Sequence, residues 1–132
     1  MKRKTKKSTL KKLQKRAETL WKLYCLQRDK SCRFPCNLRR CGTTQRLQVH
    51  HIFSRNKKRI FLDVDNGVVL CSAHHTKITF DDTAKETLRR TLDPDVYERL
   101  YEQSKIGGSF NEWKSVEWIE GQIRILQEMV GE

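Results

Sequence analysis

Long apolar runs are missing from this chain. No stretch approaches the roughly 20 apolar residues that a membrane-spanning helix needs, and the N-terminus lacks the apolar segment of a secretory signal. These absences predict a cytoplasmic protein with no membrane partner. In a reducing compartment, cysteines that lie close together in the sequence favour metal binding over disulfides.

Apolar residues are scarce overall. They make up 36% of the 132 residues, and the mean hydropathy is −0.78. A chain of this length has room for one compact domain with a modest core. A core this thin is often supported by a bound metal or a partner. We therefore expect a single domain over residues 1–132.

Acidic residues are absent from the first sixteen positions, which hold nine lysines and arginines. The net charge of the whole chain is +12. A dense positive segment releases the counterions condensed on a polyanion, so nucleic acid is the expected partner. A solubilising tail is the alternative. Within this segment we assign DNA contact to Lys11, Lys12 and Lys15.

Hydrophobic periodicity predicts an α+β chain. Apolar residues recur every three or four positions from Thr9, which indicates a helix with a basic outer face. The C-terminal end of the chain is rich in glutamate and could pair with this basic helix, within the monomer or across a dimer. The expected elements are a basic tail (1–8), a helix (9–29), a cysteine-bearing loop (31–45), a strand (47–53), a loop (54–59), a turn (65–67), an apolar run (68–70) and helices over 73–79, 83–91, from Asp93-Pro94, and 110–130.

Metal-ligating residues gather in one region. Residues 32–79 hold all four histidines, as two adjacent pairs, and four of the five cysteines. Thiolates select zinc, whereas Mg²⁺ prefers oxygen ligands. The pattern thus predicts two different sites.

A zinc site is predicted from cysteine spacing. Cys36 and Cys41 would form one half, and Cys71 and His74 the other, giving a tetrahedral Cys3His set. Cys32 competes with Cys36 for the first position. Buried thiols without a metal are the alternative reading of these cysteines, and Cys25 is expected in the core.

The remaining histidines are free for other chemistry. His50 and His51 are neighbours on a predicted strand, so their side chains should point to opposite faces. His75 follows His74 on a predicted helix and is rotated from it by about 100°. Asn66 lies in a turn, where its amide can orient a neighbouring imidazole or backbone.

Three segments, LQVHHIF, DNGVVLC and SAHHTK, resemble the HNH endonucleases, also called the His-Me finger or ββα-metal nucleases. With RDKSC and the Cys41-Gly42 pair, they are similar to phage-encoded members that carry a treble-clef zinc site. The resemblance covers about residues 28–80. It implies a ββα-metal core over residues 30–80, stapled by zinc and flanked by the basic helix and by a helical part over 81–132.

The resemblance also implies roles for single residues. His50 and His75 match ligands of a catalytic Mg²⁺ or Mn²⁺, His51 matches the general base, and Asn66 matches the residue that braces the loop. The sequence departs from the family pattern at His74, where cysteine is usual, in the long gap of the first zinc half, and at Thr79, where some relatives carry a third imidazole. An imidazole near its ordinary pKa of about 6.5 could accept a proton at neutral pH.

The predicted function is metal-dependent hydrolysis of DNA phosphodiester bonds. Five further cations are expected to hold the DNA backbone: Lys57, Lys58, Arg59, Arg39 and Arg40. A double-strand break would require two active sites or two nicks, which makes a homodimer an option. The alternatives are a zinc-containing module that binds nucleic acid without cutting it, and an accessory component of a phage DNA-processing machine.

Overall fold

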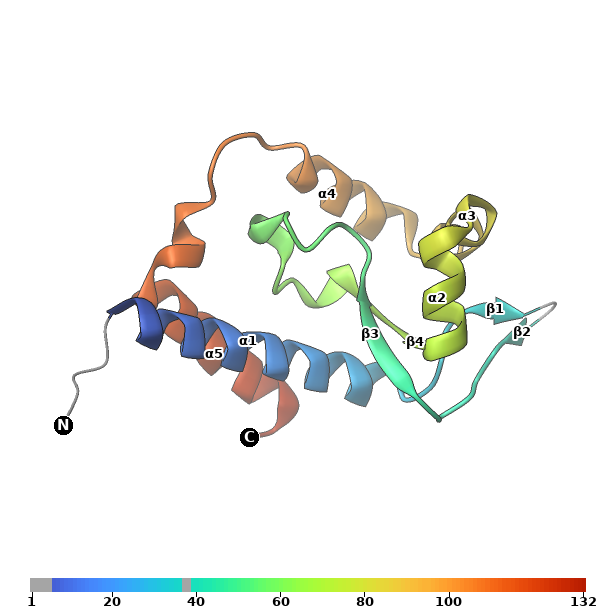
Figure 1. Ribbon diagram of the computed structural model, residues 1–132, viewed down its shortest axis with the longest axis horizontal. Helices are drawn as coiled ribbons and strands as arrows, with labels where there is room; N and C mark the ends of the chain where they lie inside the picture. Colours follow the sequence, from blue (N-terminus) through green and yellow to red (C-terminus); the bar gives the residue numbers. More distant parts are fainter. Residues whose placement is uncertain (1–5, 37–38) are drawn as a thin grey trace.

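The computed structural model describes residues 6–36 and 39–132. Within that part the chain is α+β, with five α-helices and two small antiparallel sheets (Figure 1). The elements, in order, are α1 (Lys6–Asp29), β1 (Pro35–Cys36), β2 (Arg39–Arg40), β3 (Leu47–His51), the 3-10 turns Lys58–Ile60 and Val64–Asn66, β4 (Gly67–Cys71), α2 (Ser72–Phe80), α3 (Asp82–Arg89), α4 (Pro94–Ser104), the 3-10 turn Asn111–Lys114, and α5 (Val116–Val130).

The long helix α1 carries the predicted apolar stripe. Ala17, Leu20 and Trp21 are fully buried, whereas Lys11, Lys12 and Lys15 on the other side are exposed. The helix starts at Lys6, so the basic tail predicted over residues 1–8 is helical in its last part; residues 1–5 lie outside the described residues. No described helix is apolar over a length sufficient to cross a bilayer.

The sheet formed by β3 and β4 lies between α1 and α2 (Figure 1). Because side chains alternate along a strand, Val69 packs with Trp21 of α1, whereas Val68 and Leu70 pack with Ile78 of α2. The predicted strand over 47–53 ends at His51. The predicted loop over 31–45 contains the short hairpin β1–β2.

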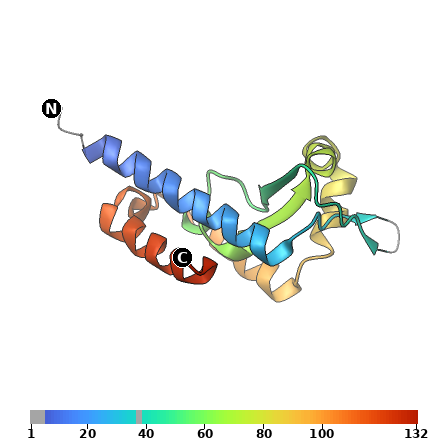
Figure 2. The same cartoon turned by 90° about the horizontal axis from the view of Figure 1, so that it is seen from below.

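The C-terminal part wraps back onto α1. Asp93 caps α4, as the predicted helix start at Asp93-Pro94 requires, and Asp81 caps α3. The helix predicted over 110–130 is divided, because Ser115 is extended and caps α5 instead of continuing from the 3-10 turn. Helix α5 packs along α1 (Figure 2), and Glu132 pairs with Arg16 within the monomer.

Gly67 is required by close packing beneath the sheet. A Cβ atom at this position would lie 2.6 Å from Cζ2 of Trp21 and 2.7 Å from Sγ of Cys25. We expect Gly67→Ala to lower the free energy of unfolding by roughly 2 kcal/mol, because an overpacked core must shift backbone or side chains. Chemical denaturation measures this loss.

Gly121 provides the matched control. It lies within α5, and a Cβ there would meet only the end of Arg124, at 3.8 Å. Gly121→Ala should therefore stabilise the protein slightly, since alanine favours a helix interior over glycine. Equal effects of the two substitutions would contradict the packing argument.

A buried carboxylate ties the end of α1 to the sheet. Asp29 accepts hydrogen bonds from Arg28 (2.8 and 3.0 Å), from Arg33 (3.1 Å) and from the backbone N–H of Val69 (3.0 Å). Burial alone would raise the pKa of Asp29. The hydrogen bonds from Arg28 and Val69 and the two positive charges outweigh burial, and the pKa lies below the ordinary 3.8.

The lowered pKa of Asp29 predicts a pH-dependent contribution to stability. A depressed folded-state pKa stabilises the protein above the unfolded pKa, and this contribution is lost as the pH falls through the folded value. Asp29→Asn should cost roughly 2 kcal/mol at neutral pH. Its difference from wild type in unfolding free energy should shrink from about pH 4 downward. A difference that is constant down to about pH 2 would contradict this assignment.

Candidate metal and histidine site

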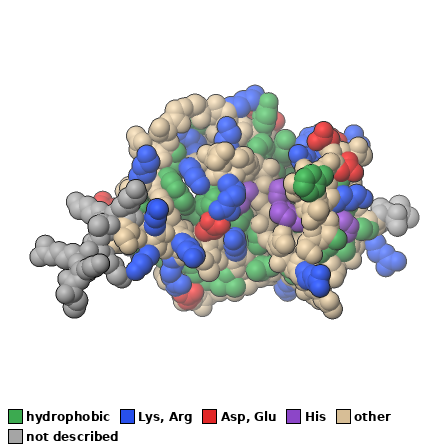
Figure 3. Space-filling model, viewed as in Figure 1, with side chains coloured by type: hydrophobic (Ala, Val, Ile, Leu, Met, Phe, Trp, Pro, Cys, Tyr) green, Lys and Arg blue, Asp and Glu red, His purple; other side chains and the backbone are tan. Residues whose placement is uncertain are grey.

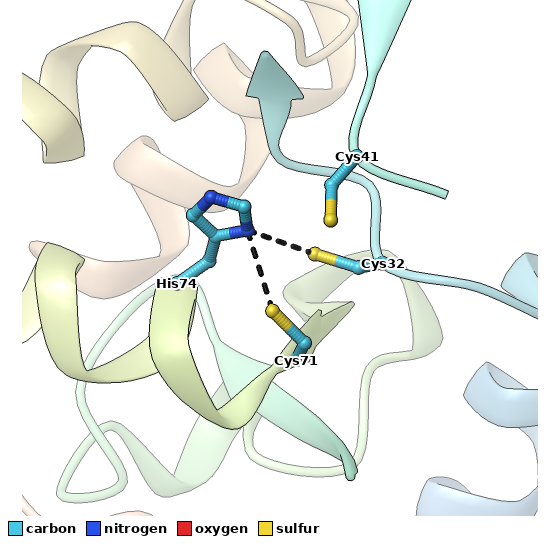
Figure 4. A group of neighbouring side chains, drawn as sticks. All are labelled: Cys32, Cys41, Cys71 and His74. Atoms are coloured by element: carbon cyan, nitrogen blue, oxygen red, sulfur yellow. Dashed lines mark hydrogen bonds between the residues drawn. The ribbon is translucent and has the colours of Figure 1, made fainter. Parts of the chain in front are cut away.

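Four ligand atoms from three segments converge beside α2. The sulfur atoms of Cys32, Cys41 and Cys71 and a ring nitrogen of His74 all lie within 4.8 Å of one another (Figure 4). Three thiols and an imidazole are the donor set of structural zinc sites. The cluster could therefore bind a metal such as zinc.

Backbone pairing holds the cysteines of this cluster in place. The N–H of Cys32 donates to Thr43 O, that of Gly42 donates to Cys32 O, and that of Cys41 donates to Phe34 O. These bonds place Cys32 opposite the segment that carries Cys41. Cys71 is the last residue of β4, and His74 follows in the first turn of α2.

Cys32, and not Cys36, completes this cluster, which corrects the predicted set of Cys36, Cys41, Cys71 and His74. The Nδ1 atom of His74 lies 3.4 Å from Sγ of Cys32 and 3.3 Å from Sγ of Cys71. Sγ of Cys36 lies 3.5 Å from the other ring nitrogen, Nε2. Side chains alternate along the extended segment that starts at Cys32, so Cys32, Phe34 and Cys36 all face His74. Cys36 lies farther along the β1–β2 hairpin, so its sulfur approaches the far ring nitrogen of His74 and not the nitrogen that Cys32 and Cys71 approach.

His50 and His75 form a second group, outside the cysteine cluster. Their ring centroids are 5.3 Å apart, with one ring edge-on to the other. Burial, followed by the charges of His75 and His51, lowers the pKa of His50 to about 4. A neutral imidazole keeps a lone pair for a metal ion. The pair therefore supplies two of the ligands that a divalent ion would need.

His51 faces the opposite side of β3, as strand alternation predicts. Its ring is stacked between Trp21 (4.1 Å) and Phe61 (4.6 Å), and Nε2 lies 3.1 Å from the carbonyl oxygen of Phe61. Because a carbonyl only accepts, Nε2 carries the proton and Nδ1 holds the lone pair. Burial lowers the pKa of His51 to about 4 although the Phe61 carbonyl opposes this, which corrects the expectation of an ordinary pKa.

Asn66 closes the loop between the two strands. Its Oδ1 accepts from the N–H of Phe53 (2.8 Å), and its Nδ2 donates to the carbonyls of Ile60 (3.1 Å) and Phe53 (3.4 Å). The side chain is fully buried. Asn66, the last residue of the loop, thus holds the start of the loop at Phe53 and its middle at Ile60, which precedes the Phe61 carbonyl that orients His51.

A hollow of about 400 Å³ reaches the two adjacent histidines. His50 and His51 form part of its wall, and helices α3 and α4 supply Lys85, Arg89 and Tyr97. The sequence reasoning missed these three residues. Lys85 and Arg89 are four positions apart in a predicted helix, but Asp82 and Glu86 line the same hollow, so the charges of this helix gave no clear signal for them.

The predicted DNA-binding cations are spread over the molecule. Lys58 lies over the rings of Phe61 and Trp113, and Arg59 lies over Phe110. The exposed strand β2, which carries Arg39 and Arg40, is at the opposite end of the long axis from the start of α1 (Figure 1). On the face drawn in Figure 3, histidine side chains lie beside many lysines and arginines.

Comparison with known proteins identifies no relative of this chain. No protein-family model, curated protein or solved structure matches this chain.

Proposed function

We propose that the protein is a metal-dependent endonuclease of the HNH kind that hydrolyses phosphodiester bonds in DNA. One observation carries this proposal. The ring centroids of His50 and His75 are 5.3 Å apart, and the neighbouring His51, held by a backbone carbonyl, lines the same hollow as His50. Paired imidazoles beside an oriented imidazole supply both a metal site and a proton acceptor.

Each residue has a role in the proposed hydrolysis. Nδ1 of His51 accepts a proton from the attacking water, since Nε2 is engaged with Phe61. Asn66 keeps the Ile60–Phe61 backbone in place and so preserves the orientation of His51. A divalent ion such as Mg²⁺ or Mn²⁺, held by His50 and His75, would stabilise the negative charge that develops on the phosphate and the leaving oxygen.

The remaining features support binding of a polyanion. The chain carries a net charge of +12, and exposed lysines of α1, including Lys11, Lys12 and Lys15, lie on its outer side. Lys57, Lys58 and Arg59 belong to the loop that Asn66 closes, where they line a second hollow with Phe110 and Trp113. Zinc in the Cys32, Cys41, Cys71 and His74 cluster would join the β1–β2 segment to the start of α2, next to His75.

Plasmid nicking tests the proposed function. Zinc-loaded protein should convert supercoiled plasmid to the open circle when Mg²⁺ or Mn²⁺ is added, and should leave it intact without these ions. By resemblance to the HNH endonucleases, the ends should carry 5′-phosphate and 3′-hydroxyl groups. A mobility-shift assay on the same plasmid reports binding independently of cutting.

The outcomes separate the rival functions. Tight binding without nicking under any divalent ion would identify a zinc-containing nucleic-acid-binding module. Nicking that needs added proteins of a phage DNA-processing machine would identify an accessory component. Either result would overturn a self-sufficient endonuclease.

A further inference from the structure

An aromatic surface lies next to the histidine hollow. Phe53 follows His51 by two residues, and its ring centroid lies 5.2 Å from that of Tyr97 and 6.4 Å from that of Tyr101 on α4. The rings of Tyr97 and Tyr101 are nearly parallel, at 8°, with centroids 6.5 Å apart. These rings are one helical turn apart, so α4 presents them side by side.

Packing explains only part of this surface. Tyr97 is half-buried and connects the surface to the hollow, because it lines the same wall as His50 and His51. Tyr101 is 39% exposed, which is unusual for a ring whose only task is to fill a core. The surface thus extends from the hollow out to solvent.

Cations lie over both tyrosines. Arg89 lies 5.3 Å from the ring centroid of Tyr97, and Nζ of Lys105 lies 4.0 Å from that of Tyr101. Arg89 is also paired with Glu86, so its charge is partly neutralised in the free protein. Aromatic rings combined with cations bind unpaired nucleic-acid strands, since every base offers a π-face and the cations meet the backbone.

From this arrangement we propose that Tyr97 and Tyr101 stack on an unpaired base next to the phosphodiester in the histidine hollow. The preferred substrate is then DNA with unpaired nucleotides, such as a single strand or a forked end, because the bases of a continuous duplex are stacked on each other. This inference rests on the proposed function for the position of the scissile bond.

Binding measurements without cutting test the stacking surface. Zinc-loaded protein is titrated, with no added Mg²⁺ or Mn²⁺, into fluorescent oligonucleotides of one sequence presented as single strand, forked duplex and full duplex. We expect the first two to bind roughly 10-fold more tightly than the full duplex. Equal affinities for all three would overturn the proposal.

Two variants of one residue isolate the ring. Tyr101→Leu keeps an apolar side chain at an exposed position and should weaken binding of the unpaired substrates roughly 10-fold, with little change for the full duplex. Tyr101→Phe keeps the ring and should bind like wild type. A correctly folded Leu variant with unchanged affinity for single strands would contradict the proposal.

A fluorescent base gives a direct signature of stacking. 2-Aminopurine in the unpaired arm of the fork should lose fluorescence on binding to wild type and to Tyr101→Phe, and should lose less with Tyr101→Leu. Equal quenching by all three proteins would also contradict the proposal. Because no cutting is involved, failure of the nicking assay and failure of the stacking assay can be told apart.

Discussion

The wild-type protein is expected to purify with about one zinc per chain, and Cys32→Ser to purify without it and to melt about 10 °C or more lower. Cys32 is fully buried, and its sulfur lies 3.4 Å from Nδ1 of His74 within the four-ligand cluster. A serine hydroxyl is a poor substitute for a thiolate, and binding energy of a structural zinc is folding energy. We expect the loss to be roughly 3 kcal/mol or more, since this small core cannot compensate.

Cys36→Ser is the matched control for this prediction. The two residues are four positions apart, and both sulfurs lie close to His74, but only Cys32 belongs to the cluster. Metal analysis of the purified Cys36 variant should give about one zinc per chain, with a melting temperature close to that of wild type. Zinc loss in the Cys36 variant with retention in the Cys32 variant would restore the ligand set expected from spacing.

Replacing His51 with glutamine is expected to reduce the rate of plasmid nicking by about 100-fold to 10,000-fold, the usual contribution of a general base. The glutamine amide can still donate to the Phe61 carbonyl, which accepts from Nε2 in the native protein. It has no basic nitrogen in place of Nδ1. The variant therefore removes the proton acceptor while preserving most of the contact.

Two measurements separate this effect from damage to the fold. His51→Ala should lose activity to the same extent and also stability, because it removes the ring stacked between Trp21 and Phe61. The DNA affinity of the glutamine variant should be close to that of wild type. A glutamine variant that nicks at the wild-type rate would show that His51 is a core residue.

The divergence of the adjacent histidines was predictable from local rules. Strand alternation places His50 and His51 on opposite faces, and the structure gives them partners on α2 and α1 respectively. The cap at Asp93 and the turn that carries Asn66 follow from residue preferences in the same way. These features depend on neighbours in sequence, which is why sequence reasoning reached them.

Features that depend on tertiary pairing were missed. The choice between Cys32 and Cys36 depends on which of them lies opposite the Cys41 segment, and spacing along the chain does not contain that register. The burial that lowers the pKa of His51 comes from Trp21 and Phe61, which are distant in sequence. The aromatic surface of Phe53 and α4 also required the packing of two separate segments.

Titration of Mn²⁺ into zinc-loaded protein, followed through the imidazole NMR signals, tests most directly whether His50 and His75 share a divalent ion. A paramagnetic ion broadens the signals of the groups nearest to it. The account predicts that the signals of His50 and His75, whose ring centroids are 5.3 Å apart, broaden together, ahead of that of His74 in the cysteine-histidine cluster. Sharp signals from His50 and His75 at Mn²⁺ concentrations that support nicking would contradict it.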